Sequence, residues 1–117
     1  PVHCSESGKL LLAFKPAAER ALLIEALSLT RHTERTICDR QLLAAELDRI
    51  AANGYALDNE EYVLGVACVA VPVRTADGEV VAAVAVHAAT ARLPLARAIE
   101  FVPRLTEAAT ALARTFG

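Results

Sequence analysis

The chain has 117 residues, which is enough for one domain with a substantial hydrophobic core. Hydrophobic residues make up 55% of it, yet no apolar run approaches the roughly 18 residues that a membrane-spanning helix needs. The formal net charge is −2, and there is no basic stripe of the kind that phosphate contacts require. These totals argue against a membrane protein and against nucleic-acid binding by this chain alone.

The cysteine content indicates a reducing compartment. Cys4, Cys38 and Cys68 are an odd number, and no two of them form a C-x-x-C pair. We therefore expect free thiols rather than a disulfide framework, and a cytoplasmic protein.

The first 30 residues predict two helices. Ser5 or Ser7 is a suitable N-cap for a helix that ends near Phe14. Pro16 suits the first turn of a second helix, because the N–H group that proline lacks is unpaired there anyway.

A polar, basic loop over residues 30–38 separates these helices from a third one. Asp39 is a good N-cap for the third helix, and Gly54 is a typical residue to end it. Residues 55–57 then predict an extended segment, and residues 58–61 predict an acidic turn.

Two runs rich in valine and alanine, residues 63–73 and 80–86, predict β-strands. Asp77 and Gly78 lie between them, and Asp-Gly between hydrophobic runs is a strong signal for a tight hairpin. We therefore expect a long antiparallel hairpin over residues 61–87. Because both faces of the hairpin are apolar, we expect other elements to cover it on both sides.

One face of this hairpin carries two polar side chains among aliphatic ones. Side chains alternate along a strand, so Cys68, Ala85 and His87 share a face. A two-residue turn would place Cys68 opposite His87, whereas a four-residue loop would place it opposite Ala85. Both registers keep the three residues on the same face, which we take as the candidate functional surface.

Pro94 opens the last predicted helix, which extends to about Phe116 and ends at Gly117. Pro103 falls inside this helix and removes one backbone hydrogen bond, so a kink or a helix restart is expected there. The order of elements is helices, then strands, then a helix, which is typical of an α+β domain.

Polar, small and glycine residues also occur in a characteristic order along nearly the whole chain. They are His3, Ser7, Gly8 and Lys9; then Thr33, Thr36 and Asp39; then Gly54, Tyr55, Asp58, Glu60, Glu61, Gly65, Cys68 and Pro72; and finally Gly78 and Val80. This ordered set resembles the effector-binding domain of IclR-type bacterial transcriptional regulators. The resemblance implies a GAF-like α+β fold, with helices flanking a curved antiparallel sheet that cups a small-molecule pocket.

In regulators of this type the effector domain follows a winged helix-turn-helix domain. The resemblance therefore implies that residues 1–117 are most of an effector-binding domain, and that the DNA-binding domain and the first strands of the effector domain are absent. It also implies a small-metabolite effector and a homodimer or homotetramer. DNA would be contacted only through the missing domain, and no membrane is involved.

The resemblance also implies the ligand contacts. They are Glu6, Ser7, Asp58, Cys68, Ala85 and His87. Several family members have a small residue in place of Glu6 and hydroxyls in place of Ala85 and His87, a set that suits a small keto acid. Because Glu6 and Asp58 would repel a carboxylate, we expect a different effector here.

We consider three other functions: a metal sensor, an enzyme and a dimerisation module. The first two would use residues of the same predicted site. Glu6, Asp58, Cys68 and His87 offer donors that suit zinc, which would make the domain a metal sensor, although their spacing matches no short metal motif. Asp58, Cys68 and His87 also have the composition of an acid, a nucleophile and a base, but no oxyanion feature accompanies them, so we expect no enzyme, no catalytic residue and no cofactor. The domain could instead serve purely for dimerisation.

Overall fold

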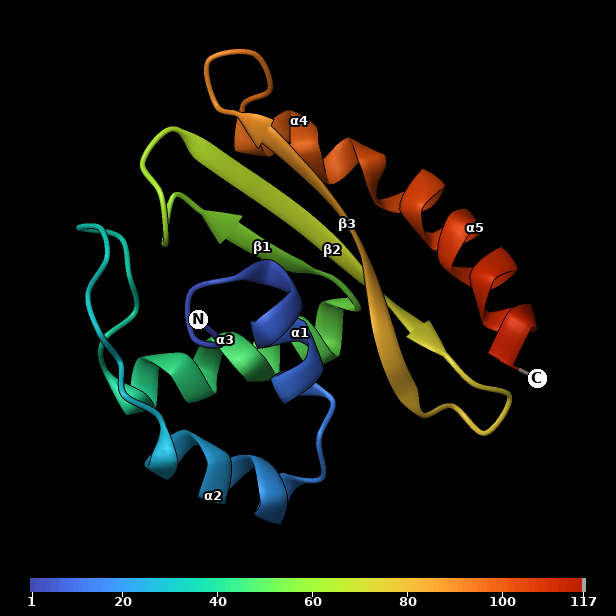
Figure 1. Ribbon diagram of the computed structural model, residues 1–117, viewed down its shortest axis with the longest axis horizontal. Coiled ribbons are helices and arrows are strands. Elements are labelled where there is room, and N and C mark those ends of the chain that lie inside the picture. Colours follow the sequence, from blue (N-terminus) through green and yellow to red (C-terminus); the bar gives the residue numbers. More distant parts are fainter. Residues whose placement is uncertain (117) are drawn as a thin grey trace.

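The computed structural model describes residues 1–116, so Gly117, expected to end the last helix, lies outside the described residues. The elements in chain order are α1 (Glu6–Ala13), α2 (Ala17–Ala26), α3 (Arg40–Asn53), β1 (Ala56–Asn59), β2 (Val66–Arg74), β3 (Val80–Ala89), α4 (Leu95–Ala98), the 3-10 helix η1 (Ile99–Phe101), α5 (Val102–Ala113) and the 3-10 helix η2 (Arg114–Phe116) (Figure 1). The predicted α+β class is confirmed.

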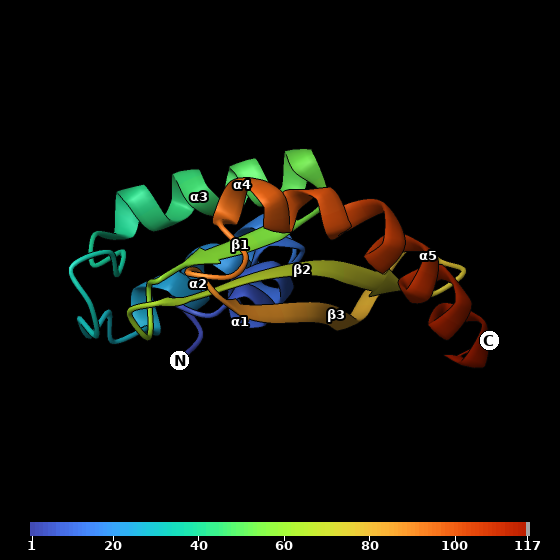
Figure 2. The ribbon, with the colours of Figure 1, turned by 90° about the horizontal axis from the view of Figure 1, so that it is seen from above.

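The strands form one antiparallel sheet in the order β1-β2-β3. In Figure 1, α1, α2 and α3 lie on one side of the strands and α5 lies on the other. The molecule is flat, with extents of 39 × 39 × 19 Å, as the view from above shows (Figure 2). None of the described helices is long and apolar enough to span a membrane.

Each face of the sheet has its own hydrophobic core. On the first face, α1, α2 and α3 bury an aliphatic cluster that includes Leu10, Leu43 and Leu47 against Ala56 and Ala70. On the second face, α4 and α5 cover the three central valines of β2 and contribute Ala98, Leu105 and Ala109. The prediction that a hairpin apolar on both faces is covered on both sides is confirmed.

Helix caps lie where the sequence placed them. The Ser5 hydroxyl accepts a hydrogen bond from the backbone N–H of Gly8 at 3.1 Å, and Asp39 accepts from the N–H of Leu42 at 3.0 Å. At the other end of α3, Gly54 adopts φ = 81°, a left-handed conformation that glycine reaches without steric strain.

The hairpin starts later than predicted. β2 begins at Val66, because residues 63–65 form a turn in which Gly65 has a φ of 81° and Leu64 is exposed. β3 extends to Ala89, two residues beyond the predicted end of the hairpin at residue 87. The apolar character of residues 63–64 was misleading, since these side chains face solvent.

The register places Cys68 opposite His87, as a two-residue turn would. The connection itself is longer, however, because a bulge at Val73/Arg74 shifts the pairing before the loop. The backbone N–H of Gly78 donates to the carbonyl of Thr75 at 2.9 Å, and the backbone N–H of Thr75 donates to the carbonyl of Glu79 at 2.8 Å. The structure therefore combines the first expected register with a longer loop.

The last predicted helix is interrupted. The 3-10 helix η1 separates α4 from α5, and Pro103 lies in the first turn of α5, where no intrahelical N–H is needed. The expected restart at this proline is confirmed.

Candidate functional site

The centre of the candidate site is a chain of contacts between the sheet and the first turn of α1. Cys68 of β2 lies opposite His87 of β3, with its Sγ atom 3.0 Å from His87 Nδ1. The other ring nitrogen, Nε2, lies 3.1 Å from Oε1 of Glu6, the first residue of α1. Glu6 and Cys68 are buried, whereas the side chain of His87 is 62% exposed.

One arrangement of protons satisfies all three groups with a neutral imidazole. A carboxylate oxygen only accepts, so His87 Nε2 carries the proton and donates to Glu6. Nδ1 then holds a lone pair and accepts from the thiol of Cys68. The cluster is thus a directed series of hydrogen bonds from Cys68 through His87 to Glu6, and its middle member, the imidazole, is open to solvent.

Asp58 joins this surface from β1, where it pairs with Cys68. The prediction of a turn starting at Asp58 is wrong, because Asp58 and Asn59 are strand residues and the chain leaves the strand only at Glu60. Burial raises the pKa of Asp58 to about 6, and the negative charges of Glu61 and Glu6 act in the same direction. The hydrogen bond from the backbone N–H of Glu61 to Asp58 Oδ1, at 2.8 Å, opposes that rise.

Cys68 remains a protonated thiol in this environment. Burial raises its pKa to about 12, and the nearby carboxylates of Glu6 and Asp58 add to the shift. A nucleophilic cysteine needs the opposite, an electropositive site that lowers the thiol pKa. Although Cys68 and His87 are in contact, the pair has the wrong electrostatics for covalent catalysis.

The other two predicted contacts occupy different positions. The hydroxyl of Ser7 donates to Glu6 Oε1 at 3.4 Å. Ala85 lies two residues before His87 and pairs with Ala70, so it shares the face but packs against the core under α1. The structure thus brings Glu6, Ser7, Cys68 and His87 into one set of contacts, with Asp58 beside it on β1.

The same cluster contains three possible metal ligands. Glu6, Cys68 and His87 each offer one donor atom, and these atoms lie within 4.8 Å of one another. Asp58, which the sequence analysis included in a four-residue zinc site, is not part of this group. The arrangement could hold a cation, with an open position on the exposed side of His87.

A second polar centre was not predicted. Lys9, one turn after Glu6 on α1, is completely buried. Its Nζ atom lies 2.9 Å from both carboxylate oxygens of Glu61 and from Oε2 of Glu46, and it donates to all three. It also donates to the carbonyl of Leu57. The only signal in the sequence was the position of Lys9 in the ordered family set, because a single lysine in a helix is normally exposed.

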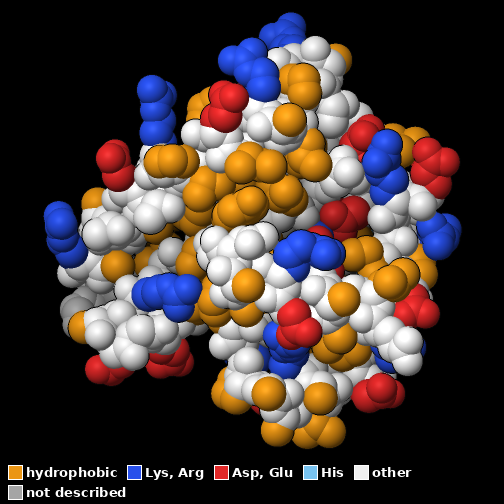
Figure 3. Space-filling view, turned by 180° about the vertical axis from the view of Figure 1, so that it is seen from behind, with side chains coloured by type: hydrophobic (Ala, Val, Ile, Leu, Met, Phe, Trp, Pro, Cys, Tyr) orange, Lys and Arg blue, Asp and Glu red, His pale blue; other side chains and the backbone are white. Residues whose placement is uncertain are grey.

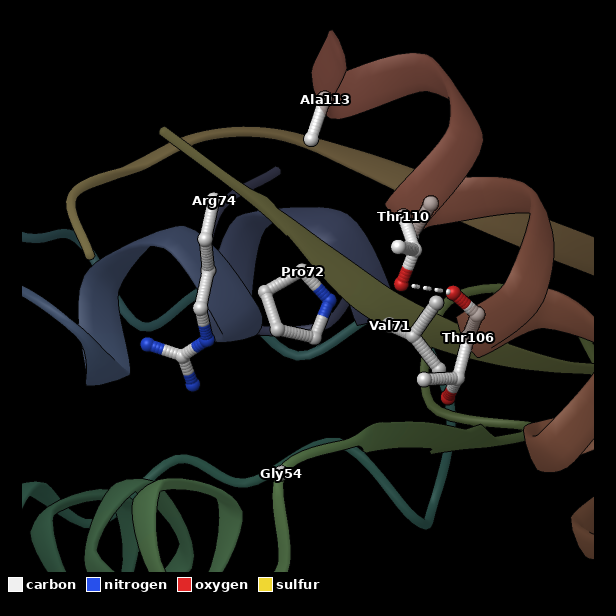
Figure 4. Close-up of a pocket in the computed structure, with 8 residues that line it drawn as sticks. Gly54, Val71, Pro72, Arg74, Thr106, Thr110 and Ala113 are labelled. Atoms are coloured by element: carbon white, nitrogen blue, oxygen red, sulfur yellow. Dashed lines mark hydrogen bonds between the residues drawn. The ribbon is translucent and has the colours of Figure 1, made fainter. Parts of the chain in front are cut away.

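The cavity in Figure 4 lies away from the candidate site. It has a volume of about 280 Å³ and is lined by Gly54, Val71, Pro72, Arg74, Thr106, Ala109, Thr110 and Ala113. None of the six predicted ligand contacts lines it. The hydroxyls of Thr106 and Thr110 already donate to carbonyls one turn earlier in α5, at 2.8 and 2.9 Å, so this cavity offers few free polar groups.

The sequence matches a family of bacterial regulators. Residues 1–114 match the model of the bacterial transcriptional regulator IclR C-terminal family. The chain is 40% identical over 116 residues to the probable transcriptional regulator SauR of Cupriavidus necator, covering 99% of this chain and 46% of SauR. The chain therefore spans about half the length of the curated relatives it matches.

Solved structures agree with this match. The inducer-binding domain of a PobR double mutant from Acinetobacter, in complex with 3-hydroxybenzoic acid, superimposes with a TM-score of 0.91 at 33% identity, over 97% of this chain and 65% of that one. The C-terminal domain of Escherichia coli KdgR gives 0.89 at 35% identity, over 97% and 70%. This chain belongs to the IclR family of bacterial transcriptional regulators, within whose C-terminal domain it lies.

Proposed function

We propose that residues 1–117 form most of the effector-sensing domain of an IclR-type regulator. The effector is a small organic molecule bound at the surface formed by Glu6, Ser7, Asp58, Cys68, Ala85 and His87. Occupancy of that site controls DNA binding by a winged helix-turn-helix domain outside this chain. In this proposal the domain is a cytoplasmic sensor with no catalytic residue.

One observation carries the proposal. The series Cys68–His87–Glu6 joins the middle of the sheet to the start of α1, and its middle member is an exposed ring. A ligand that hydrogen-bonds to one member competes with the present partner of that member, so its binding changes the contacts of the neighbouring groups. The same contacts therefore provide both recognition and a route from the ligand to α1.

The charges at the site select among effectors. Glu6 and Asp58 are buried carboxyls at the same surface, and Lys9 is already occupied by Glu61 and Glu46. An effector is therefore favoured if it brings hydroxyl or other donor groups rather than a carboxylate alone. The hydroxy acid bound by the PobR domain shows that a structural relative accommodates both kinds of group.

A thermal-shift screen of the purified chain tests the proposal. The panel should contain hydroxybenzoates, other hydroxy acids, keto acids and neutral polyols. A ligand at about 100 times its dissociation constant adds roughly 2.7 kcal/mol of stability, which is several degrees for a domain of this size. A reproducible shift from one chemical class is expected.

Two leucine variants locate the binding. Cys68→Leu should abolish the shift by filling the site, whereas Cys38→Leu, at a half-buried cysteine outside it, should preserve the shift. Equal loss in both variants, or in neither, would contradict the assignment. In the full-length regulator, the same ligand should change operator affinity, and Cys68→Leu should remove that response.

A second candidate function is assembly. Figure 3 shows hydrophobic side chains gathered near the middle of the face seen from behind, with charged side chains around them. Elsewhere on the described surface, Leu22 of α2 and Leu42 of α3 are 73% and 63% exposed. Light scattering on the wild type and on Leu22→Glu tests whether the α2 surface holds copies of the chain together: a loss of mass in the variant would support it.

A further inference from the structure

A second group of metal-binding side chains lies outside the proposed effector site. His3, Cys4 and His32 each offer one donor atom, and these atoms lie within 4.8 Å of one another. His3 and Cys4 are buried in the turn before α1, whereas His32 lies at the surface in the loop between α2 and α3. The group shares no residue with Glu6, Cys68 and His87.

The hydrogen bond of His3 leaves one ring nitrogen available to a cation. Nε2 lies 2.8 Å from the carbonyl oxygen of Thr30. A carbonyl only accepts, so Nε2 carries the proton and Nδ1 carries the lone pair. Metal-binding histidines typically donate their second ring N–H to a backbone carbonyl or carboxylate in this way.

The loop that carries His32 is held in place before any ion binds. The backbone N–H of His32 donates to Thr36 Oγ1 at 3.0 Å, and Thr36 Oγ1 in turn donates to the carbonyl of Glu61. The imidazole of His32 also packs edge-on against the ring of Tyr62, with centroids 4.9 Å apart. The position of His32 is therefore fixed from two sides, which lowers the entropy lost on coordination.

We propose that His3, Cys4 and His32 bind Zn²⁺. Two imidazole nitrogens and one thiolate are a ligand set that zinc prefers, and a water molecule completes a tetrahedron on the exposed side of His32. Cys4 loses its thiol proton to solvent when the metal–sulfur bond forms, and no electron is transferred. The ion joins the turn before α1 to the loop between α2 and α3.

Such an ion would act on the segment that leads into α1. Cys4 directly precedes Ser5, the N-cap of α1, and Glu6 is the first residue of that helix. Zinc would therefore fix the segment that positions Glu6 without occupying the effector surface. The inference does not depend on the identity of the effector.

Zinc titration of the purified chain by calorimetry tests the site, with His32→Asn as the diagnostic variant. His32 is exposed, so this change should leave the fold intact, and it should weaken the zinc affinity at least tenfold. The matched control is His87→Asn, which removes the exposed histidine of the other cluster and should leave this affinity unchanged. Wild-type affinity in His32→Asn would overturn the proposal.

Cobalt provides an independent readout of the thiolate. A Co²⁺ complex at this site should show a sulfur-to-metal charge-transfer band that Cys68→Ala retains and that Cys4→Ala loses. If the band and the zinc affinity disappear in the Cys68 and His87 variants instead, the ion binds at the Glu6 cluster and the assignment is wrong. If Cys4→Ala folds poorly, the zinc titration of His32→Asn still tests the site, because that titration does not use the cysteine variant.

Discussion

Glu6 and Lys9 are both buried on α1, three residues apart, but they belong to opposite kinds of polar centre. Lys9 is completely enclosed, and its ammonium group donates to Glu61, Glu46 and a backbone carbonyl. Glu6 instead bonds to an imidazole whose side chain is 62% exposed. One centre is closed and the other is open to solvent.

The difference shows how the same helix can support the fold and the site. A buried charge is tolerated when its partners are fixed and complete, and Lys9 meets that condition by joining α1 to α3, to β1 and to the segment after β1. The Glu6 centre keeps one side free, and burial raises the pKa of its neighbour Asp58 in spite of the opposing charge of Lys9. The closed centre serves stability, and the open one leaves interactions for a ligand.

The largest expected effect comes from opening the closed centre. Lys9→Met leaves the buried Glu61 without its cation, and removing one partner of a buried ion pair costs about 3–5 kcal/mol. The melting temperature should fall by roughly 10–20 °C. Lys15→Met, at an exposed lysine near the end of the same helix, is the control and should change it little. A loss below about 1 kcal/mol in Lys9→Met would mean that the closed centre is not structural.

The next effect is the pH dependence that Asp58 introduces. Its pKa is about 6 in the folded chain against 3.8 for the free residue, so the folded state binds the proton more tightly. Proton binding at Asp58 therefore stabilises the folded chain. This stabilisation is fully present below pH 3.8, is lost as the pH rises through 6, and amounts to about 3 kcal/mol at most.

Urea unfolding between pH 4 and pH 7 measures this contribution. Asp58→Asn keeps an oxygen for the N–H of Glu61 but cannot ionise, so the decline in stability with rising pH should largely disappear. Asp77→Asn, at an exposed aspartate in the hairpin loop, should retain the decline. If Asp58→Asn declines as steeply as the wild type, another group causes the effect.

The two centres also differ in how far they could be predicted. Alternation along the strands placed Cys68 and His87 on one face, because side-chain direction in a strand depends only on parity. The Lys9 centre joins residues 37 and 52 positions apart, and no local pattern reports such distances. Its prediction would have required the tertiary packing of α1 against α3.

The boundaries failed for a related reason. Val63 and Leu64 are as apolar as the strand that follows, yet they are exposed in a turn that includes Gly65. Asp58 looked like a turn residue, although the sheet buries it beside Cys68. In each case the tertiary fold overrode the intrinsic preference of the residue, because the whole fold decides which side chains are buried and which are exposed.

A smaller effect tests how Glu6 is positioned. Ser5→Ala removes the side-chain cap of α1 and should cost about 1 kcal/mol, as typical N-cap losses do. Ser7→Ala is the matched control: its hydroxyl makes only a 3.4 Å contact with Glu6, so the loss should be clearly smaller. Denaturant unfolding of both variants distinguishes the two serines. Equal losses would show that the cap contributes no more than the contact with Glu6.

The last prediction concerns the open end of the site, where the change should affect binding more than stability. His87→Gln removes a ring that is 62% exposed, and hydrogen bonds in exchange with water contribute only about 0.5–1.5 kcal/mol each. Stability should therefore fall by less than in Lys9→Met, while the thermal shift produced by an effector should drop strongly. A variant that binds the effector like the wild type would remove the imidazole from the site. A variant that unfolds as readily as Lys9→Met would show that both centres are structural, and the distinction between closed and open would fail.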